Sequence, residues 1–562
     1  MFYPEIKGLN SVKQLREEWK IKEALQIILE LEQRDDLSLK ESLSYKLVKA
    51  DLLRISGNDL EAVEIAEEIL QEFQKLGDLV SSFDALLIQA YVYMMIVNVS
   101  KSEDIIRQLE SLLNVIKETL SIDLRERESQ FARIKGGIFF LKGEIQRSLE
   151  LTIRAYELAK DVGNKELISA SLNNIADKYY HLKDYDKAIM YAKEVFKLKT
   201  NQYLPAALGT LIEINVSKGD INEAIIYLDQ LREYSEKFDT KPSKVCYQSS
   251  KAFILKSSLR ARDRIQAEDI FKELAIDNTI HSYVRIEAII NLCDLYLTEL
   301  RITNDPEIIN EMHVCIQELL NIAEKQNLYL YLAETYFLQA KLALLTLDLK
   351  KAKQFLTQAQ KIAELYGLKR LAMKISFEHD KLLRKTKMWE SLKNAEVDIS
   401  ELLELTGLNE EMENMVQRRL VEVPEISKED PVMLLILTDG GNLLFSKKFT
   451  EDFSFEDDLL GGFLTTINYF ITEVFSEGLD RAIFGQYTLL MMPLQPFLIC
   501  YIFKGYSYFA HRKIERFLES IQNDELIWQS LQNFFQKNKS IQKYSVPSLE
   551  SLITEIFIEE KN

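Results

Sequence analysis

Apolar residues recur with a helical spacing through most of the first 370 residues of the chain. In the clearest stretch, Leu172, Ala176 and Tyr179 follow one another at steps of four and three, which is the spacing of one helix face. Ala188 follows Ala176 after twelve positions. The same twelve-residue step recurs at Ala50–Ala62, Gly136–Ser148, Ile212–Ala224, Leu255–Ala267 and Ala340–Ala352. This self-similarity predicts a series of stacked helix pairs.

The second members of these pairs give the period of the repeat. They stand at positions 62, 148, 188, 224, 267 and 352, at intervals of 86, 40, 36, 43 and 85 residues. The two wide intervals are about twice the others, so each is expected to contain one further repeat with a degraded motif, at about 79–119 and 281–325. Residues 41–366 are therefore predicted to hold about eight repeats with a period near 40 residues.

The segment Leu172-Asn173-Asn174-Ile175-Ala176, followed by Asp184-Tyr185-Asp186-Lys187-Ala188-Ile189, closely resembles a tetratricopeptide repeat. The resemblance implies two antiparallel helices that approach each other through Ala176 and Ala188, and a right-handed superhelix of stacked pairs. Gly57, Gly143 and Gly219 stand where helices of the motif should end, and glycine tolerates the left-handed backbone found there. The resemblance also implies that the first helix of each repeat lines a concave groove for a protein or peptide.

The phase of that motif places a set of polar and aromatic residues in the implied groove. These candidate partner-binding residues are Asp51, Arg54, Arg133, Asn173, Asp177, Tyr180, Glu213, Lys256 and Lys341. Their charges are mixed. Some family members bind a C-terminal carboxylate with a dense set of Lys, Arg and Asn, which is represented here only by Asn173 and Asn174. Each candidate can equally be an ordinary solvated position.

Helical segments flank the predicted array on both sides. Residues 1–40 are expected to contain an N-terminal capping helix, with apolar positions such as Leu15 and Trp19. Residues 367–423 are predicted as a helical extension that leaves the array. Residues 424–430, between Pro424 and Pro431, are acidic and polar and are predicted to form a linker.

Beyond the linker the pattern changes from helical to strand-like. A strand-length apolar run at 432–437 is followed by the hairpin sequence Asp439-Gly440-Gly441-Asn442 and a returning strand from Leu443. An apolar stripe at 460–475 predicts one amphipathic helix. Further elements are expected in sequence order: strands near 480–485, 486–492 and 496–503, a helix at 507–521, and C-terminal helical segments at 524–537 and 547–559, within residues 522–562.

The resulting order, β-β-α-β-β-β-α over residues 431–521, is similar to the longin or roadblock class of profilin-like domains. That resemblance implies a sheet that docks a small Ras-like GTPase or a second copy of itself. The predicted fold class is thus mainly α, an α-α superhelix followed by a small α+β domain.

Composition agrees with a mostly helical protein. Only 18 of the 562 residues are glycine and 9 are proline, while 47% are hydrophobic, which excludes disordered, collagen-like and all-β classes. Lys and Arg number 70 against 88 Asp and Glu, a net charge of −18. This charge opposes nonspecific binding to nucleic acid or anionic lipid, so neither is an expected partner.

The chain is expected to be cytoplasmic and without a membrane span. Residues 1–5 do not lead into a basic and apolar signal segment. Four cysteines, Cys246, Cys293, Cys315 and Cys500, form no CxxC pair and are expected to be free thiols. The uncharged stretch 482–503 is long enough to cross a bilayer, but Pro493 and Pro496 favour strands around a turn instead.

Catalytic signatures are absent from the sequence, so the chain is predicted not to be an enzyme. It contains no phosphate-binding GxxxxGK[ST] loop, no HExxH and no GxSxG, and no cofactor is expected. His281, Cys293, His313 and Cys315 are the most metal-like group. Cys293 and Cys315 could face each other across a turn, but the two histidines fall at other heights and angles. Packing is the favoured interpretation and no metal is expected.

Two functions remain open at this point. The first is a protein-interaction scaffold, in which the groove binds a protein or peptide and the C-terminal domain docks a small GTPase or another copy of itself. The alternative is a regulator whose superhelix changes pitch when a signalling peptide fills the groove.

Overall fold

The computed structural model describes residues 9–34, 36–95, 99–198, 200, 203–325, 328–395, 397–417, 421, 424–425, 428–438, 442–450, 481–537 and 546–558. Contacts divide the chain into two compact units. The first, called the array unit, contains residues 1–348, 365–368 and 397–421. The second, called the sheet unit, contains residues 349–364, 369–396 and 422–562.

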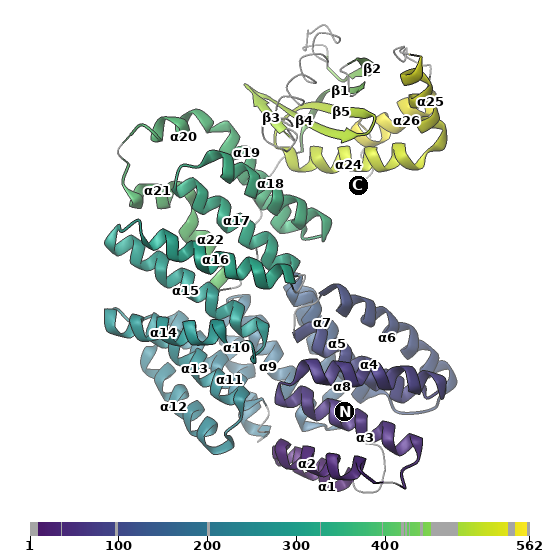
Figure 1. Cartoon of the computed structure of the whole chain (residues 1–562), viewed down its shortest axis with the longest axis vertical. Helices are drawn as coiled ribbons and strands as arrows, with labels where there is room; N and C mark the ends of the chain where they lie inside the picture. The colour runs from purple at the N-terminus through teal and green to yellow at the C-terminus, as the bar shows by residue number, and fades with distance from the viewer. Residues whose placement is uncertain are drawn as a thin grey trace. The chain divides into compact units, whose positions relative to one another are not determined.

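The array unit is a series of antiparallel helices with a tetratricopeptide-like winding (Figure 1). Its helices are α1 (Leu9–Glu17), α2 (Ile21–Glu32), α3 (Leu39–Ser56), α4 (Asp59–Lys75), α5 (Leu79–Met95), α6 (Val99–Thr119), α7 (Arg125–Leu141), α8 (Ile145–Val162), α9 (Lys165–His181), α10 (Tyr185–Leu198), α11 (Leu204–Lys218), α12 (Ile221–Phe238), α13 (Lys241–Lys256), α14 (Ala261–Ile276), α15 (Ser282–Thr303), α16 (Ile308–Lys325), α17 (Tyr329–Leu345), α21 (Ile399–Thr406) and α22 (Leu408–Val416). Helix pairs lie at both positions where a degraded repeat was predicted, α5–α6 at 79–119 and α15–α16 at 281–325.

Small residues allow the paired helices to approach closely, as the motif implied. Ala176, Ala188 and Ala192 are fully buried. A Cβ atom placed on Gly136 of α7 would lie 3.1 Å from the carbonyl oxygen of Ser148 on α8, which is tighter than ordinary van der Waals contact. Gly143 ends this hairpin's first helix with φ of 76°, a conformation that costs glycine little.

The sheet unit contains three helices that precede its strands in the chain: α18 (Leu349–Leu365), α19 (Lys369–Arg384) and α20 (Thr386–Leu392). The sequence assigned α18 to the end of the array and the other two to an extension. The predicted domain limits therefore differ from the division into compact units, and they remain predictions.

Five antiparallel strands form the sheet, in the order β2-β1-β5-β4-β3. They are β1 (Asp430–Thr438), β2 (Leu443–Lys448), β3 (Arg481–Phe484), β4 (Tyr487–Leu494) and β5 (Phe497–Lys504). Each strand lies within a few residues of its predicted position, so the interpretation of 482–503 as strands is confirmed. The predicted helix at 460–475 and most of the turn at 439–442 lie outside the described residues.

Both faces of the sheet are apolar and buried. One face packs Ile436, Tyr501 and Phe503 against α24 (Ser507–Asn523), α25 (Glu525–Gln536), α26 (Pro547–Ile553) and a π-helical turn (Thr554–Ile558). The other face carries Met433, Leu435 and Cys500, which are also buried. Among the helices that the structure describes, none combines the length and the apolar character needed to cross a bilayer.

Arg481, the first residue of β3, joins the sheet to α18 and α19 through a buried polar network. Its side chain is 1% exposed and its Nη1 lies 3.3 Å from Oδ1 of Asp380, a carboxylate that is fully buried. Its Nη2 donates to Oε1 of Gln360 at 2.6 Å, and Nη1 donates to Oγ of Ser507 at 2.7 Å. Asp380 also accepts the backbone N–H of Ser507 at 2.7 Å. These bonds compensate for the burial of two opposite charges.

Candidate functional site

Seven charged and aromatic residues gather on alternate helices of the array unit. This group, called the Arg133 cluster, contains Arg16 on α1, Asp51 and Arg54 on α3, Tyr91 on α5, Arg133 on α7, Glu166 on α9 and Tyr203 just before α11. All six helices are odd-numbered, and from α3 onward the odd helices are the first members of their repeats (Figure 1). The resemblance assigned those helices to the binding groove.

Ion pairs hold one side of the Arg133 cluster. Arg54 Nη2 lies 2.6 Å and Arg16 Nε 3.5 Å from the carboxylate of Asp51, whose side chain is fully buried. Burial acts to raise the pKa of Asp51, but the two guanidinium groups outweigh it and lower the pKa to about 2. Arg16 Nη1 also lies 2.8 Å from Oε2 of Glu166, 150 positions along the chain.

Arg133 occupies a different position in the cluster, because it pairs with no carboxylate among the described residues. Its guanidinium lies 5.6 Å from the ring centroid of Tyr91, and the guanidinium of Arg54 lies 4.4 Å from the same centroid. Its Nε atom is buried and has no hydrogen-bond partner among the described residues. The electrostatic neighbours of the Tyr203 hydroxyl include Arg133 and Tyr91, and burial raises the pKa of that hydroxyl. A partly buried cation with an unused donor is a suitable anchor for an anionic ligand group.

The structure thus brings together three of the nine predicted partner-binding residues, Asp51, Arg54 and Arg133. Sequence reasoning missed Arg16, Tyr91, Glu166 and Tyr203. Arg16 lies on the capping helix and Tyr91 in a repeat with a degraded motif, so the phase of the motif could not assign them. The sequence signals for the pair were an arginine in the capping segment, Arg16, and a glutamate in the first turn of α9, Glu166.

Three other predicted residues lie farther along, on α9 and α11. Asp177 is held by Lys178 at 2.9 Å and His181 at 3.2 Å. Burial opposes ionisation of Asp177, but these two groups lower its pKa well below the usual range. Burial and the nearby carboxylate of Glu213 raise the pKa of Tyr180, whose side chain is almost fully enclosed.

The remaining predicted residues do not join either group. Asn173 has a buried Oδ1 atom without a hydrogen-bond partner among the described residues. Lys256 on α13 bonds Asn291 at 2.6 Å and Asp294 at 2.8 Å on α15. Lys341 on α17 is buried. A role for any of these in partner binding remains a prediction.

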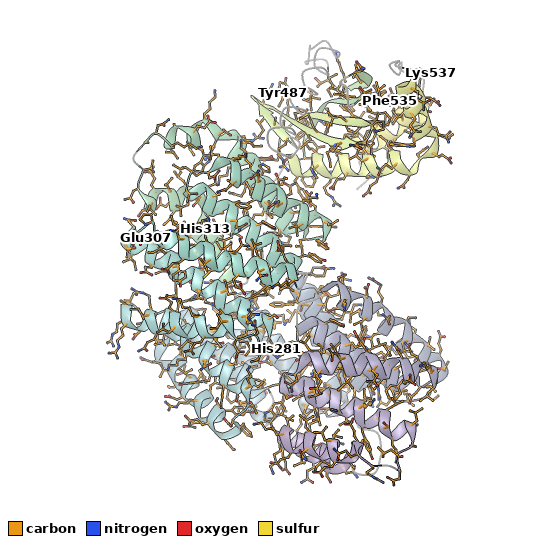
Figure 2. The ribbon with its side chains drawn as sticks, in the orientation of Figure 1. His281, Glu307, His313, Tyr487, Phe535 and Lys537 are labelled. Carbon is orange, nitrogen blue, oxygen red and sulfur yellow. The ribbon has the colours of Figure 1, made fainter. Side chains whose placement is uncertain are left out.

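The side chains of His281, Cys293, His313 and Cys315 do not meet at one point, so they do not form a metal site. The thiols of Cys293 and Cys315 are hydrogen-bonded to each other, and this bond together with burial raises the pKa of Cys293. His281 Nδ1 instead lies 2.7 Å from Oδ2 of Asp59 on α4, and His313 Nδ1 lies 2.9 Å from the carbonyl oxygen of Ile309. Figure 2 shows the two histidines well apart.

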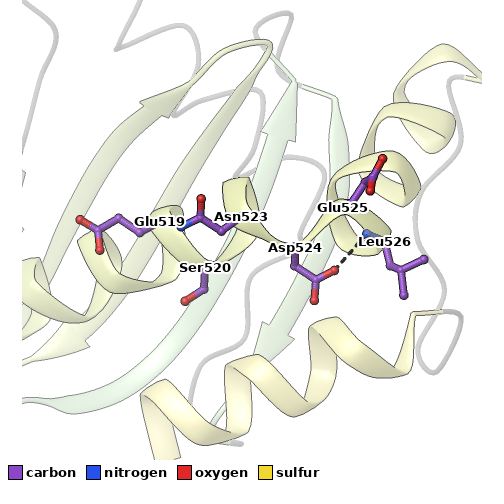
Figure 3. A pocket seen from close by; sticks show the side chains of 6 residues that line it. All are labelled: Glu519, Ser520, Asn523, Asp524, Glu525 and Leu526. Atoms are coloured by element: carbon purple, nitrogen blue, oxygen red, sulfur yellow. Dashed lines mark hydrogen bonds between the residues drawn. The ribbon is translucent and has the colours of Figure 1, made fainter.

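Two cavities on the surface have fewer polar groups available for a ligand than the Arg133 cluster has. A cavity of about 150 Å³ between α6, α7 and α8 is lined by Glu110, Lys117, Glu128 and Lys135, whose charges are already paired with one another. A shallow surface hollow of the sheet unit runs from Glu519 to Leu526 (Figure 3). Its Asp524 accepts the backbone N–H groups of Leu526 and Ile527, both at 3.0 Å, as the N-cap of α25.

Comparison with known proteins supports the repeat. Residues 131–201 match the family model described as tetratricopeptide repeat. This segment spans most of α7 and all of α8, α9 and α10, and it contains Arg133 and Glu166. The predicted tetratricopeptide character is confirmed for these residues.

A curated relative, response regulator aspartate phosphatase I of Bacillus subtilis (strain 168), is 32% identical over 101 residues. The alignment covers 17% of this chain and 26% of the relative, so the chain matches about a quarter of that relative's length.

Three solved structures are similar to this chain. A Rap protein complexed with Competence and Sporulation Factor is 15% identical with a TM-score of 0.40, covering 67% of this chain and 99% of that chain. The apo form of RapI is 17% identical, with a TM-score of 0.39 and coverage of 50% and 99%. The apo quorum sensor NprR from B. thuringiensis is 13% identical, with a TM-score of 0.39 and coverage of 66% and 97%.

Proposed function

We propose that the array unit binds a peptide or a protein segment and that Arg133 binds a carboxylate of this ligand. The observation that carries the proposal is the partly buried guanidinium of Arg133 near Tyr91 and Tyr203, which has no carboxylate partner and an unused Nε donor among the described residues. The tetratricopeptide match over residues 131–201 supports a protein-interaction role for the same helices. A carboxylate would supply both the missing charge and the missing acceptor.

The rest of the cluster shapes this site. Arg54 and Arg16 are neutralised by Asp51 and Glu166, so they hold the helices in place while Arg133 remains available. Tyr91 and Tyr203 offer flat, apolar faces with a polar edge, which suit the backbone and side chains of an extended peptide.

Peptide selection tests the proposal directly. The full chain is incubated with a pool of short random peptides that have free C-terminal carboxylates and acidic side chains. A second pool has its C-terminal and side-chain carboxylates amidated. Retained peptides are identified by mass spectrometry. We expect retention from the first pool only, and about a hundredfold weaker binding by Arg133→Gln, because about 1.5–3 kcal/mol is typical of a hydrogen bond to a charged group.

Arg107→Gln is the matched control. Arg107 lies on α6, is 69% exposed and pairs with Asp104 one turn away, so this substitution makes the same charge change without touching the cluster. Equal retention by the wild type and Arg133→Gln would contradict the proposal, and so would equal retention of the amidated pool.

Peptide binding at this site is compatible with two functions, a protein-interaction scaffold and a regulator that changes shape when its ligand binds (a switch). In the switch, ligand binding at helices from several repeats changes the superhelical pitch. Small-angle scattering of the full chain with a saturating selected peptide distinguishes the two, because only the switch predicts a change in the radius of gyration.

The curated relative is by its name a phosphatase that acts on response regulators. The expectation that this chain is not an enzyme therefore remains a prediction. Incubation of the full chain with a phosphorylated response-regulator receiver domain, with loss of the phosphoryl group followed over time, tests it. Acceleration over the spontaneous rate would overturn the expectation.

A second proposal concerns residues 431–521, as a docking surface for a small Ras-like GTPase or for another copy of the chain. It is supported by the order of the described elements, two strands followed later by three strands and a helix. Capture experiments with the full chain as bait, with GDP or a non-hydrolysable GTP analogue, test it. Nucleotide-dependent capture supports GTPase docking, and capture of neither a GTPase nor the chain itself removes the proposal.

A further inference from the structure

Three metal-ligating side chains converge within the sheet unit, away from the Arg133 cluster. Glu364 lies near the end of α18, and His511 and Glu515 are one turn apart on α24. One ligand atom from each residue lies within 4.8 Å of the others. His511 Nδ1 is 3.2 Å from Oε2 of Glu364 and 3.6 Å from Oε1 of Glu515. None of the three appears in any sequence motif, because the site is assembled from elements almost 150 residues apart.

These separations fit the coordination sphere of a small cation. In a tetrahedral zinc site with bonds of about 2.0–2.1 Å, neighbouring ligand atoms stand about 3.3 Å apart. Both distances from His511 Nδ1 are close to that value. Two carboxylates and one imidazole are also a donor set that zinc accepts, with a fourth position left for water or another ligand. Glu515 is one-third exposed, so that position can be reached from solvent.

The hydrogen bonding of His511 independently indicates a missing ligand. Its Nδ1 atom is buried and has no hydrogen-bond partner among the described residues, although two carboxylates are near. An imidazole nitrogen directed at two carboxylates has the arrangement of a metal ligand.

A second layer of bonds orients the carboxylate of Glu364. Gln360 Nε2 donates to Oε1 of Glu364 at 2.8 Å, which leaves Oε2 directed toward His511. Gln360 is itself fixed by Arg481, whose charge is compensated by Asp380. Ligand carboxylates in metal sites are commonly held in this way by neighbouring polar groups. Arg512 lies near the site and opposes cation binding in part.

We propose that Glu364, His511 and Glu515 form a binding site for one divalent first-row metal ion, with Zn²⁺ as the preferred ion. The ion would join α18 to α24 and so fasten the helices that precede the sheet to the helix that covers it. This site is independent of ligand binding by the array unit.

Calorimetric titration of ZnCl₂ into the chelator-treated, metal-free full chain tests the proposal. We expect one ion per chain to bind, with affinity reduced by about tenfold or more in Glu515→Gln and further in His511→Gln. His313→Gln is the matched control, because His313 is exposed on α16, where its Nδ1 lies 2.9 Å from the carbonyl oxygen of Ile309 on the same helix. Circular dichroism confirms that each variant is folded. Glu515 is partly exposed, so Glu515→Gln is expected to fold. This variant therefore still tests the site if His511→Gln does not fold.

Zinc could also bind the thiol pair Cys293–Cys315, and Co²⁺ separates the two sites. Cobalt bound by two carboxylates and an imidazole gives visible ligand-field bands without the intense thiolate charge-transfer band. Bands that disappear in His511→Gln and persist in Cys315→Ser support the proposal. No binding by the wild type, or binding unaffected by both His511→Gln and Glu515→Gln, overturns it.

Discussion

Several charged side chains of this molecule are buried and paired with one another. Arg481 and Asp380 are almost inaccessible to solvent, and each depends on the other for compensation. Two buried opposite charges add little net stability, but removal of one leaves the other uncompensated, at a cost of about 3–5 kcal/mol. The same holds for Asp51 between Arg54 and Arg16.

Asp380→Ala is therefore expected to destabilise the sheet unit by about 3–5 kcal/mol. Urea unfolding followed by tryptophan fluorescence in a Trp19→Phe background measures this, because the other two tryptophans, Trp389 and Trp528, both belong to the sheet unit. Glu555→Ala, which breaks an exposed pair with Arg516 within the sheet unit, should leave the midpoint nearly unchanged. Similar shifts for both variants would contradict this account.

Asp51 gives the array unit a defined response to acid. Its pKa falls from 3.8 to about 2 on folding, so its charge stabilises the folded state above pH 4 and this contribution is lost as the pH falls toward 2. The shift corresponds to about 2 kcal/mol. Asp51→Asn should be less stable at pH 7 and should lose less stability between pH 4 and 2 in circular-dichroism melts. Asp104→Asn, at an exposed pair, should retain the wild-type slope.

Helices and strands are the scale at which the sequence was most informative. The period of small residues predicted the array, including the repeats at α5–α6 and α15–α16 where the motif is degraded. Continuous apolar runs of strand length, bounded by turn residues, predicted the strands of the sheet. The periodicity of apolar residues shows which face of a helix or strand is buried. The element that packs against this face is usually the next one along the chain, so it can be inferred from the sequence.

The candidate site was less predictable for the same reason. The contact of Arg16 with Glu166, or of Arg481 with Asp380, depends on how far the superhelix winds or how the sheet meets α19. No local pattern contains that information. Motif phase found Arg133 but also selected Tyr180 and Lys341, whose side chains are buried in the array.

Gly136 tests the packing of one repeat at the element scale. Leucine in its place would collide with the backbone of α8 at Ser148 and with Thr152, so Gly136→Leu should destabilise the array unit by about 1–3 kcal/mol despite its better helix propensity. Thermal unfolding measures the change. Gln146→Leu adds the same side chain at an exposed position on α8 and should change stability little. Equal stability of Gly136→Leu and the wild type would show that the hairpin is not closely packed.

At the scale of the whole molecule, contacts between successive turns of the superhelix distinguish the array unit from a simple stack. Arg16 on α1 reaches Glu166 on α9, and Asp59 on α4 reaches His281 before α15. A linear array contacts only neighbouring repeats. Here the first helices are held by a repeat that lies far along the chain.

Glu166→Ala is expected to release α1 and α2 from α9. Hydrogen exchange followed by mass spectrometry should show faster exchange in residues 9–32, because fewer contacts then oppose local opening. Glu157→Ala, at an exposed position on α8, is the control and should exchange like the wild type. Unchanged exchange in Glu166→Ala would mean that the ion pair with Glu166 does not help to hold α1 in place.

The pairing of Arg16 with Glu166 also determines how the array responds to force. A linear solenoid pulled from one end loses its repeats one after another, each at a small load. In this chain α1 is also tied to α9, so a pull on α1 must break this ion pair before the intervening hairpins can open one by one. A cellular unfoldase that begins at α1 would therefore meet its greatest resistance at the start, and the hairpins after this contact would follow more easily.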